Sequence, residues 1–247
     1  MKAYAITDVG KKRTTNQDYV YACKEPVGNL PNLFIVADGM GGHKAGDLAS
    51  RYTVETFIQE VKNSDEKNPI SIIESAISVA NKALMAKARE SIDYDGMGTT
   101  LVVATIVDDS IYIANVGDSR LYLINNEIQQ ITRDHSLVEE MVSMGELDKE
   151  SARFHEKKNI ITRAIGADPM LIADFFEVEY AKGDIILMCS DGLSNMIDDA
   201  DIRKIVNEGT ELSDIANKLI EVANNNGGKD NIAVVLVEPE NDEVNVC

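Results

Sequence analysis

The sequence is short of cysteine and of long apolar runs, and each shortage excludes a class of protein. Three cysteines among 247 residues, without regular spacing, do not make the disulfide framework of a small secreted domain. No apolar run is long enough to cross a bilayer, and the N-terminal segment lacks the apolar stretch of a signal peptide. We therefore expect reduced thiols, a cytoplasmic protein and no membrane partner.

Positive charge is also scarce. The chain carries 24 lysines and arginines against 42 aspartates and glutamates, which gives a formal net charge of −18. A nucleic-acid-binding face would have to outweigh this charge, so we expect no nucleic-acid partner. The three histidines are scattered, which excludes a histidine-rich binuclear site, and the phosphate-loop pattern GxxxxGK[ST] is absent.

The remaining composition is that of an ordinary globular protein. Hydrophobic residues make up 44% of the chain, and its length suits a domain with a sizeable core. No linker or low-complexity tract divides the sequence, so we expect a single domain over residues 1–240. Residues 241–247 should form a mobile acidic tail. Nothing in the sequence indicates more than a monomer.

Short apolar runs typical of β-strands recur along the chain. They are LFIVA (33–37), TTLVVATIV (99–107), SIYIANV (110–116), RLYLI (120–124), DIILMC (184–189) and NIAVVLVEP (231–239). The pairs Asp108-Asp109 and Asn125-Asn126 lie where hairpin turns are expected, so the sheets should be mainly antiparallel. The runs VVATIV and AVVLV hardly alternate, which indicates strands covered on both faces.

Amphipathic helical patterns alternate with these strands in blocks. They cover residues 46–62, 70–91, 136–145, 198–207 and 212–225. Ser71 with Glu74, and Ser136 with Glu139, each match the capping box that begins a helix. Hairpins flanked by long helices predict an α/β protein of the α+β kind, in which helices cover the sheets.

Residues 133–170 are the least regular part of the chain and interrupt the strand pattern. They include Arg133, His135, Lys157, Lys158 and Arg163 in an otherwise acidic sequence. We expect this segment to form a surface flap.

Four aspartates occupy related places at the ends of apolar runs. Asp38 follows FIVA, Asp118 follows IANVG and Asp191 follows ILMCS, whereas Asp230 comes just before the run NIAVVLV. If the last strand runs antiparallel to the others, all four carboxylates gather at one rim of the sheet. Taken singly, an Asp-Gly pair after a strand is more often a turn than a ligand.

Carboxylates gathered in this way need a cation or raised pKa values. With no cluster of cysteine or histidine, the oxygen ligands suit magnesium, manganese or calcium. The glycine-rich stretch DGMGGH would then hold a metal through Asp38, and the carbonyl of Gly39 is free to join the same ion.

Eight motifs in order resemble those of the metal-dependent protein phosphatase family, also called protein phosphatase 2C, and its bacterial branch in particular. They are RTTNQD (13–18), VADGMGGH (36–43), GTT (98–100), VGDSR (116–120), TRDHSL (132–137), ITRAIG (161–166), CSDGL (189–193) and KDN (229–231). The resemblance implies an α-β-β-α sandwich of two mainly antiparallel sheets flanked by helices. It covers almost the whole chain.

The resemblance also implies two core ions, Mn²⁺ or Mg²⁺. Asp38 would bridge both of them, Asp191 and Asp230 would complete the first, and the carbonyl of Gly39 would bind the second. Asp18 would reach the second ion through waters.

Three further roles are implied by position. Asp118, together with Asp191, would hold a third and weaker ion. Arg13 would grip the substrate phosphate, since a planar guanidinium matches two phosphate oxygens. Animal members carry histidine directly after the Asp-Gly pair, where this chain has Met40. Either His43 or a metal-bound water would then protonate the leaving group.

The activity implied by the resemblance is hydrolysis of phosphoserine and phosphothreonine in proteins, by attack of a metal-bridging hydroxide. The partners would be phosphorylated proteins, including a Ser/Thr kinase and its substrates. Two alternatives stay open from the residues: a pseudo-phosphatase that binds phosphoproteins without hydrolysis, and a two-metal phosphodiesterase or nuclease, which the acidic charge disfavours.

Overall fold

The computed structural model describes residues 1–42 and 45–239, apart from the side chains of residues 149 and 150. Its strands are β1 (Lys2–Asp8), β2 (Asp18–Cys23), β3 (Leu33–Met40), β4 (Gly98–Thr99), β5 (Leu101–Val107), β6 (Ser110–Val116), β7 (Arg120–Ile124), β8 (Ile128–Gln130), β9 (Asp174–Glu179), β10 (Ile185–Cys189) and β11 (Ile232–Glu238). Its helices are α1 (Ala45–Asn63), α2 (Pro69–Ala88), α3 (Leu137–Ser143), α4 (Lys149–Phe154), α5 (Asp191–Ser194), α6 (Asp199–Glu208) and α7 (Leu212–Asn225), with a 3₁₀ turn η1 (Ile92–Tyr94).

The strands form two sheets in which all paired neighbours are antiparallel. One sheet has the order β1-β11-β10-β7-β8, and the other β2-β3-β5-β6-β9, with β4 added to β3. The hairpin predicted at Asp108-Asp109 joins β5 to β6, and the one at Asn125-Asn126 joins β7 to β8. The prediction of mainly antiparallel sheets is confirmed.

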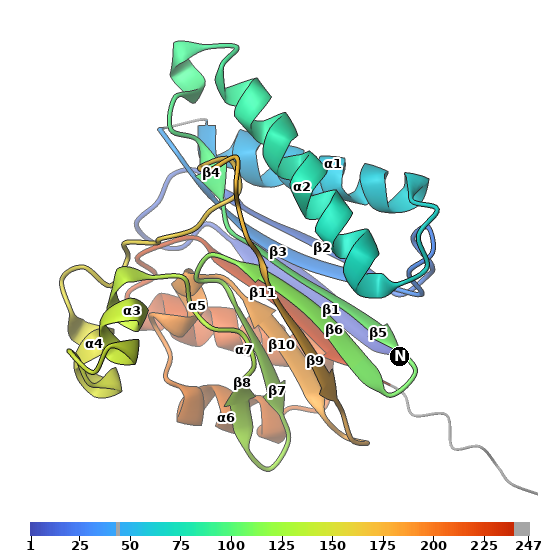
Figure 1. Cartoon of the computed structure of the whole chain (residues 1–247). Coiled ribbons are helices and arrows are strands. Elements are labelled where there is room, and N and C mark those ends of the chain that lie inside the picture. Colours follow the sequence, from blue (N-terminus) through green and yellow to red (C-terminus); the bar gives the residue numbers. More distant parts are fainter. Residues whose placement is uncertain (43–44, 240–247) are drawn as a thin grey trace, which may run out of the picture.

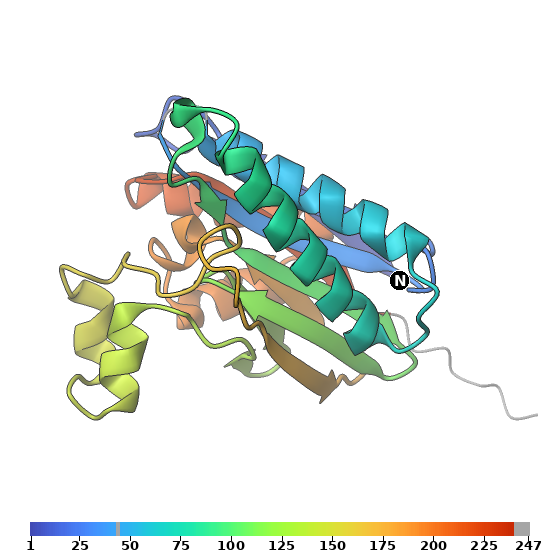
Figure 2. The same ribbon diagram turned by 45° about the horizontal axis from the view of Figure 1, so that its top comes forward.

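Helices cover both outer faces of the paired sheets. Figures 1 and 2 show α1 and α2 over the sheet that contains β3, and α6 and α7 over the sheet that contains β11. Three separate apolar layers result, one under each helix pair and one between the sheets. The expected α-β-β-α sandwich is therefore confirmed.

Strand β3 shows why the central runs carry so few polar residues. Leu33 and Ile35 pack under α1 and α2, while Phe34 and Val36 face the opposite sheet. All four are fully buried. A strand with both faces covered has no solvent side, so its sequence does not alternate.

The strands that the sequence did not predict are β1, β2, β8 and β9, which lie at the four edges of the two sheets. Their residues are mostly half-buried, so their apolar patterns are weak. The predicted run 99–107 is also divided at Thr100, where β4 ends and β5 begins.

One helix start was predicted wrongly. Helix α2 begins at Pro69, and its N-cap is Asn68, whose side chain accepts a hydrogen bond from the backbone N–H of Ser71. Proline is well suited to the first helical position because it has no N–H to satisfy. The cap predicted at Ser136 is confirmed, since its hydroxyl accepts from the N–H of Glu139.

Residues 133–170 lie largely outside the sandwich. They carry the short helices α3 and α4, which extend away from the two sheets in both views (Figures 1 and 2). The predicted tail, residues 241–247, lies outside the described residues. Within the described part of the chain, no helix combines the length and the apolar character needed to cross a bilayer.

Candidate metal centre

The predicted aspartates meet at one end of the sandwich. Strands β3 and β6 point the same way in one sheet, so Asp38 and Asp118 come to the same end. In the other sheet β10 ends and the antiparallel β11 begins there, which brings Asp191 and Asp230 together. The sequence placed all four on the rim of one sheet. The structure corrects this, because the rim is shared by two sheets.

A cavity of about 250 Å³ opens at this rim. It is lined by Arg13, Gln17, Asp38, Gly39, Met40, Gly41, Thr100, Asp118, Asn159, Ile161, Asp191 and Asp230. Asp18 is buried beside them, at the start of β2, directly across the strand pair from Asp38. The structure therefore brings together the seven residues predicted to bind metal or phosphate, namely Arg13, Asp18, Asp38, Gly39, Asp118, Asp191 and Asp230. His43 lies outside the described residues.

Each of these carboxylates makes it harder for its neighbours to lose a proton. Burial raises the pKa of Asp18 to about 7, and repulsion from Asp191 and Asp230 adds to this. Burial, followed by repulsion from Asp230, raises the pKa of Asp191 to about 6. The pKa values of Asp38 and Asp118 rise well above the ordinary range for the same two reasons. Such a group needs either bound protons or a cation.

Two carboxylate oxygens show that the site suits a cation. Oδ1 of Asp18 and Oδ1 of Asp191 are buried and have no hydrogen-bond partner in the described structure. A buried carboxylate oxygen without a donor is costly unless a cation satisfies it. The donor set consists of oxygen atoms only, which fits Mg²⁺ or Mn²⁺.

Among the described residues, no three of these carboxylates are arranged around one point as the ligands of a bound ion would be. Their other oxygens bind protein donors. Ser190 donates to Asp18 (2.7 Å), Asn195 Nδ2 donates to Asp191 (2.9 Å), and Arg13 Nη2 donates to Asp230 (2.8 Å). The bonded oxygens hold each side chain in place, and the free oxygens of Asp18 and Asp191 remain for an ion.

The motif GTT holds Asp38 at the end of β3. The N–H of Thr100 donates to the carbonyl of Asp38 (2.8 Å), and the hydroxyl of Thr100 accepts from the N–H of Asp38 (2.9 Å). The same hydroxyl lies 2.7 Å from that of Ser119, the neighbour of Asp118. A pair of buried hydroxyls thus connects the backbone of Asp38 with the residue next to Asp118.

Ser190 joins the two sheets at the rim. Its hydroxyl donates to Asp18 in one sheet and accepts from the N–H of Ala233 (2.8 Å) in the other. Ser190 is fully buried. The distance between the carboxylates of the two sheets therefore depends on this side chain.

Close backbone packing explains the glycine after Asp38. A Cβ on Gly39 would overlap the carbonyl oxygen of Gly46, which lies in the first turn of α1. No larger residue fits, so the turn presents its backbone to the cavity.

Sequence reasoning did not single out Thr100, Ser190, Asn195 or Asn231, although three of them lie inside the quoted motifs. The sequence did offer one signal for two of them, because Ser190 directly precedes Asp191 and Asn231 directly follows Asp230. The roles of Thr100, Ser190 and Asn231 depend on contacts to segments far away in the chain, which spacing does not reveal.

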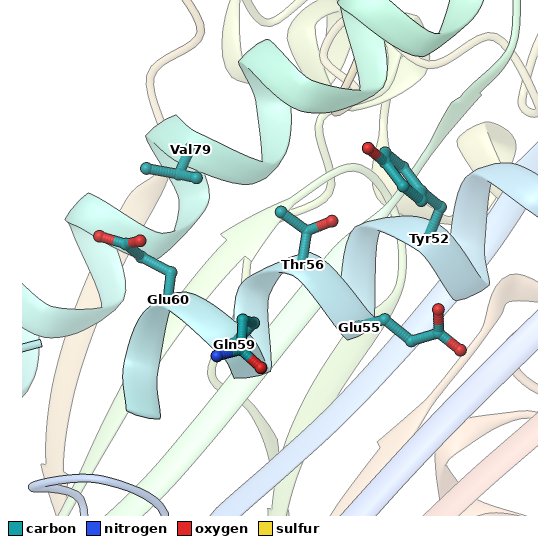
Figure 3. Close-up of a pocket in the computed structure, with 6 residues that line it drawn as sticks. All are labelled: Tyr52, Glu55, Thr56, Gln59, Glu60 and Val79. Carbon is teal, nitrogen blue, oxygen red and sulfur yellow. The ribbon is translucent and has the colours of Figure 1, made fainter. Parts of the chain in front are cut away.

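A second hollow, of about 300 Å³, lies on the outer helix layer between α1 and α2 (Figure 3). Its walls include Tyr52, Glu55 and Glu60 from α1 and Val79 from α2. Glu55 is exposed, and no buried charge or unsatisfied polar atom is found among its described walls. We therefore assign the chemistry to the rim.

The match to known proteins is extensive. The family model for protein phosphatase 2C matches residues 10–236. The chain belongs to the protein phosphatase 2C family. The serine/threonine phosphatase stp of Listeria innocua is 41% identical to this phosphatase over 247 residues, with 96% of both chains covered. The resemblance drawn from the eight motifs is confirmed.

Solved structures of related phosphatases have the same fold as this phosphatase. Serine/threonine phosphatase Stp1 from Staphylococcus aureus matches with a TM-score of 0.90 at 34% identity, covering 97% of this chain and 95% of its own. The catalytic domain of the serine/threonine phosphatase PstP, solved in complex with 2 manganese ions, matches with a TM-score of 0.82 at 32% identity, covering 95% and 96%. As a family member, this phosphatase is a metal-dependent enzyme acting on phosphorylated proteins.

The first prediction concerns the stability of the phosphatase without metal. The pKa of Asp18 is about 7 and that of Asp191 about 6 in the folded chain, above their ordinary 3.8. Folding therefore favours the protonated forms, and this contribution is lost as the pH rises through the folded values. We expect the Tm of the chelated enzyme to fall between about pH 4 and about pH 7, the range between the ordinary and the folded pKa values. Added Mn²⁺ should remove most of the fall.

Asp18→Asn is the control for this measurement, because an amide cannot titrate. The variant should show a shallower decrease of Tm with pH in the chelated state. An equal slope in both proteins would mean that other groups set the pH dependence.

The second prediction separates the central carboxylates from the outer one. Asp38→Asn, Asp191→Asn and Asp230→Asn should each lower kcat by ~10²-fold or more. The Tm without metal should not fall, since each change removes a like charge from the cluster. Asp118→Asn should act mainly by weakening one Mn²⁺ site, seen as a higher Mn²⁺ concentration for half-maximal activity. Wild-type kcat in Asp38→Asn would contradict this assignment.

Proposed function

We propose that the cavity at the shared rim is the active site, and that it hydrolyses phosphoserine and phosphothreonine in proteins. The observation that carries the proposal is the convergence of four aspartates and Arg13 on one cavity at the protein surface, with the buried Asp18 beside them. The serine/threonine specificity is that named for the relatives of this phosphatase.

Two core ions, Mn²⁺ or Mg²⁺, would be held by Asp38, Asp191, Asp230, Asp18 and the carbonyl of Gly39. Asp118 would hold a weaker third ion together with Asp191. When bound, such ions supply the acidity that activates a water at neutral pH and the charge that neutralises phosphate oxygens. The two unpartnered oxygens of Asp18 and Asp191 support this assignment.

Arg13 would bind the substrate phosphate. Its guanidinium lies at the cavity wall, 2.8 Å from Asp230, and its side chain is 48% exposed. Only one of its donors is used by Asp230, so the remaining donors can face two phosphate oxygens. The contact with Asp230 orients the fork toward the same cavity.

Among the described residues that line or adjoin the cavity, no side chain is free to act as a nucleophile in a covalent route. Cys189 is fully buried, and burial raises the pKa of its thiol to about 12. The hydroxyl of Thr100, which lines the cavity, is already engaged with Asp38 and Ser119. Direct attack by water on phosphorus is therefore the chemistry that these residues support.

Residues of the 133–170 segment complete the cavity mouth, as expected of a flap that contacts protein substrates. Asn159 and Ile161 line the cavity. Lys158 donates to Asn195 (3.0 Å), which in turn donates to Asp191. Lys158 also lies within electrostatic reach of Arg153 and Lys229. In this acidic chain these cations favour a negatively charged phosphoprotein over an uncharged ligand.

The cellular setting belongs to the same proposal. We place the enzyme in the cytoplasm as a monomer over residues 1–240, with a Ser/Thr kinase and its substrates as partners. Cys23 and Cys189 are free thiols, which supports a reducing compartment. A nuclease is disfavoured by the net charge of −18.

The third prediction tests the proposed function directly. A phosphothreonine peptide and p-nitrophenyl phosphate should both be hydrolysed with Mn²⁺ or Mg²⁺, and neither in excess EDTA. Restoring Mn²⁺ should restore turnover. Binding of the peptide without release of phosphate would instead identify a pseudo-phosphatase, and turnover in excess chelator would refute the metal centre.

The fourth prediction separates two neighbouring lysines of the flap. Lys157 is exposed, whereas Lys158 is linked through Asn195 to Asp191. Lys157→Glu should lower kcat/KM for phosphoproteins by about 2- to 5-fold. It should leave kcat/KM for p-nitrophenyl phosphate unchanged. Lys158→Glu should lower kcat/KM for both substrates, because its effect reaches a metal ligand.

Lys82→Glu is a matched control, since this exposed lysine on α2 lies in the outer helix layer. It changes the net charge by the same amount as Lys157→Glu and should leave kcat/KM for both substrates unchanged. Equal effects of Lys157→Glu and Lys82→Glu would show that only net charge matters.

A further inference from the structure

The loop between β1 and β2, residues 9–17, crosses from one sheet to the other at the metal rim. It carries Arg13 at its middle and leads directly into Asp18. Residues 11–15 are exposed, so the loop has little apolar packing to fix its shape. Its conformation must therefore come from hydrogen bonds.

A single buried side chain makes three of those bonds. Nδ2 of Asn231 donates to the carbonyls of Val9 and Thr15, both at 2.9 Å. Its Oδ1 accepts from the N–H of Gln17, also at 2.9 Å. Asn231 is only 3% exposed. One amide thus binds the loop on both sides of Arg13 and closes it at its base.

Other hydrogen bonds hold the loop before Arg13 and at its end, where Asn16 donates to Thr7 (2.9 Å) and the carbonyl of Gln17 accepts from the N–H of Gly39 (3.0 Å) and the hydroxyl of Ser50 (2.6 Å). The N–H groups of Lys11 and Lys12 donate to the carbonyl of Gly228, which holds the part before Arg13. After Arg13, the bonds at Thr15 and at the N–H of Gln17 both go to Asn231.

Asn231 is also joined to the metal site. Its own N–H donates to Oδ1 of Asp230 (2.9 Å), while Arg13 donates to Oδ2 of the same carboxylate. The loop, the arginine and the ligand therefore form one hydrogen-bonded unit. Because Asn231 directly follows Asp230, a shift of either would be passed to the other.

We infer that Asn231 is a positioning residue for phosphate binding, which holds Arg13 in reach of a phosphate bound at the metal centre. The inference rests on the proposed function, since it takes Arg13 as the group that binds phosphate. A long, half-exposed arginine on a loop without the three bonds to Asn231 would sample more positions, and bidentate contact with a phosphate needs one of them. Asn231 removes that freedom before the substrate arrives.

The test is a double-mutant cycle with Arg13→Ala and Asn231→Ala, assayed on a phosphothreonine peptide with saturating Mn²⁺. In the wild-type background Asn231→Ala should raise KM by about 3- to 10-fold, as expected for the loss of about one net hydrogen bond at the phosphate. In the Arg13→Ala background the same change should leave KM within about 1.5-fold, because the residue that it positions is gone.

Hydrogen exchange supplies a readout that does not depend on turnover. In Asn231→Ala the amide of Gln17 loses its acceptor, so exchange of the 9–17 segment should accelerate while that of β3 and β5 stays slow. Asn231→Asp keeps the volume and the acceptor. Its carboxylate has no hydrogen to donate to the carbonyl of Val9 or to that of Thr15. It replaces the alanine variant if that protein does not fold.

Asn32→Ala is the matched control. Asn32 is also a buried asparagine, 4% exposed, and its amide exchanges two hydrogen bonds of 2.8 Å with Ile106. It precedes β3, at the opposite end of that strand from Asp38. Its loss should lower Tm but leave KM unchanged.

An equal rise of KM in both Arg13 backgrounds, or no rise in either, would overturn the inference. A normal KM in Arg13→Ala alone would instead refute the proposed phosphate contact. Failure of the proposed function is seen separately, as absence of metal-dependent peptide hydrolysis by the wild-type enzyme.

Discussion

The mutual repulsion of buried carboxylates at the rim is the constraint on which the rest of the structure depends. Five aspartates meet at one end of the sandwich, where strands of both sheets begin or end, and the pKa values of four of them are raised. Bringing them together opposes folding unless protons or cations compensate. The sandwich supplies a rigid frame for this arrangement, because three apolar layers hold the strands whose ends carry the aspartates.

Hydrogen bonds within and between the two sheets hold the side chains of the site in defined positions. Ser190 connects Asp18 in one sheet with Ala233 in the other. Thr100 and Ser119 connect the ends of β3 and β6, and Asn231 fastens the loop that carries Arg13. Ser190, Thr100 and Asn231 also satisfy backbone groups that would otherwise be unpaired near a strand end. The same bonds therefore stabilise the fold and set the geometry of the cavity.

The sequence predicted the parts of the fold whose burial leaves a clear pattern. The central strands, such as β5 and β11, are covered on both faces and form continuous apolar runs. The four edge strands were missed because half-buried residues leave no such run. The start of α2 was misplaced because Asn68 and Pro69 offered a better N-cap and first turn than Ser71.

For the site, sequence position predicted which aspartates would converge, since each lies at the end of an apolar run. It could not predict that Asp38 and Asp191 come from different sheets, because that depends on long-range strand pairing. Nor could it reveal Ser190 or Asn231 as organising side chains, whose partners lie 172 and more than 200 residues away in the chain.

The central claim is that the rim carboxylates form a binuclear metal site, and anomalous diffraction from crystals grown with Mn²⁺ tests it most directly. The account predicts two strong manganese peaks in the cavity. One would lie among Asp38, Asp191 and Asp230, and the other beside Asp38 and the carbonyl of Gly39. Crystals of active enzyme with no manganese between these carboxylates, or with manganese bound only elsewhere, would contradict the account.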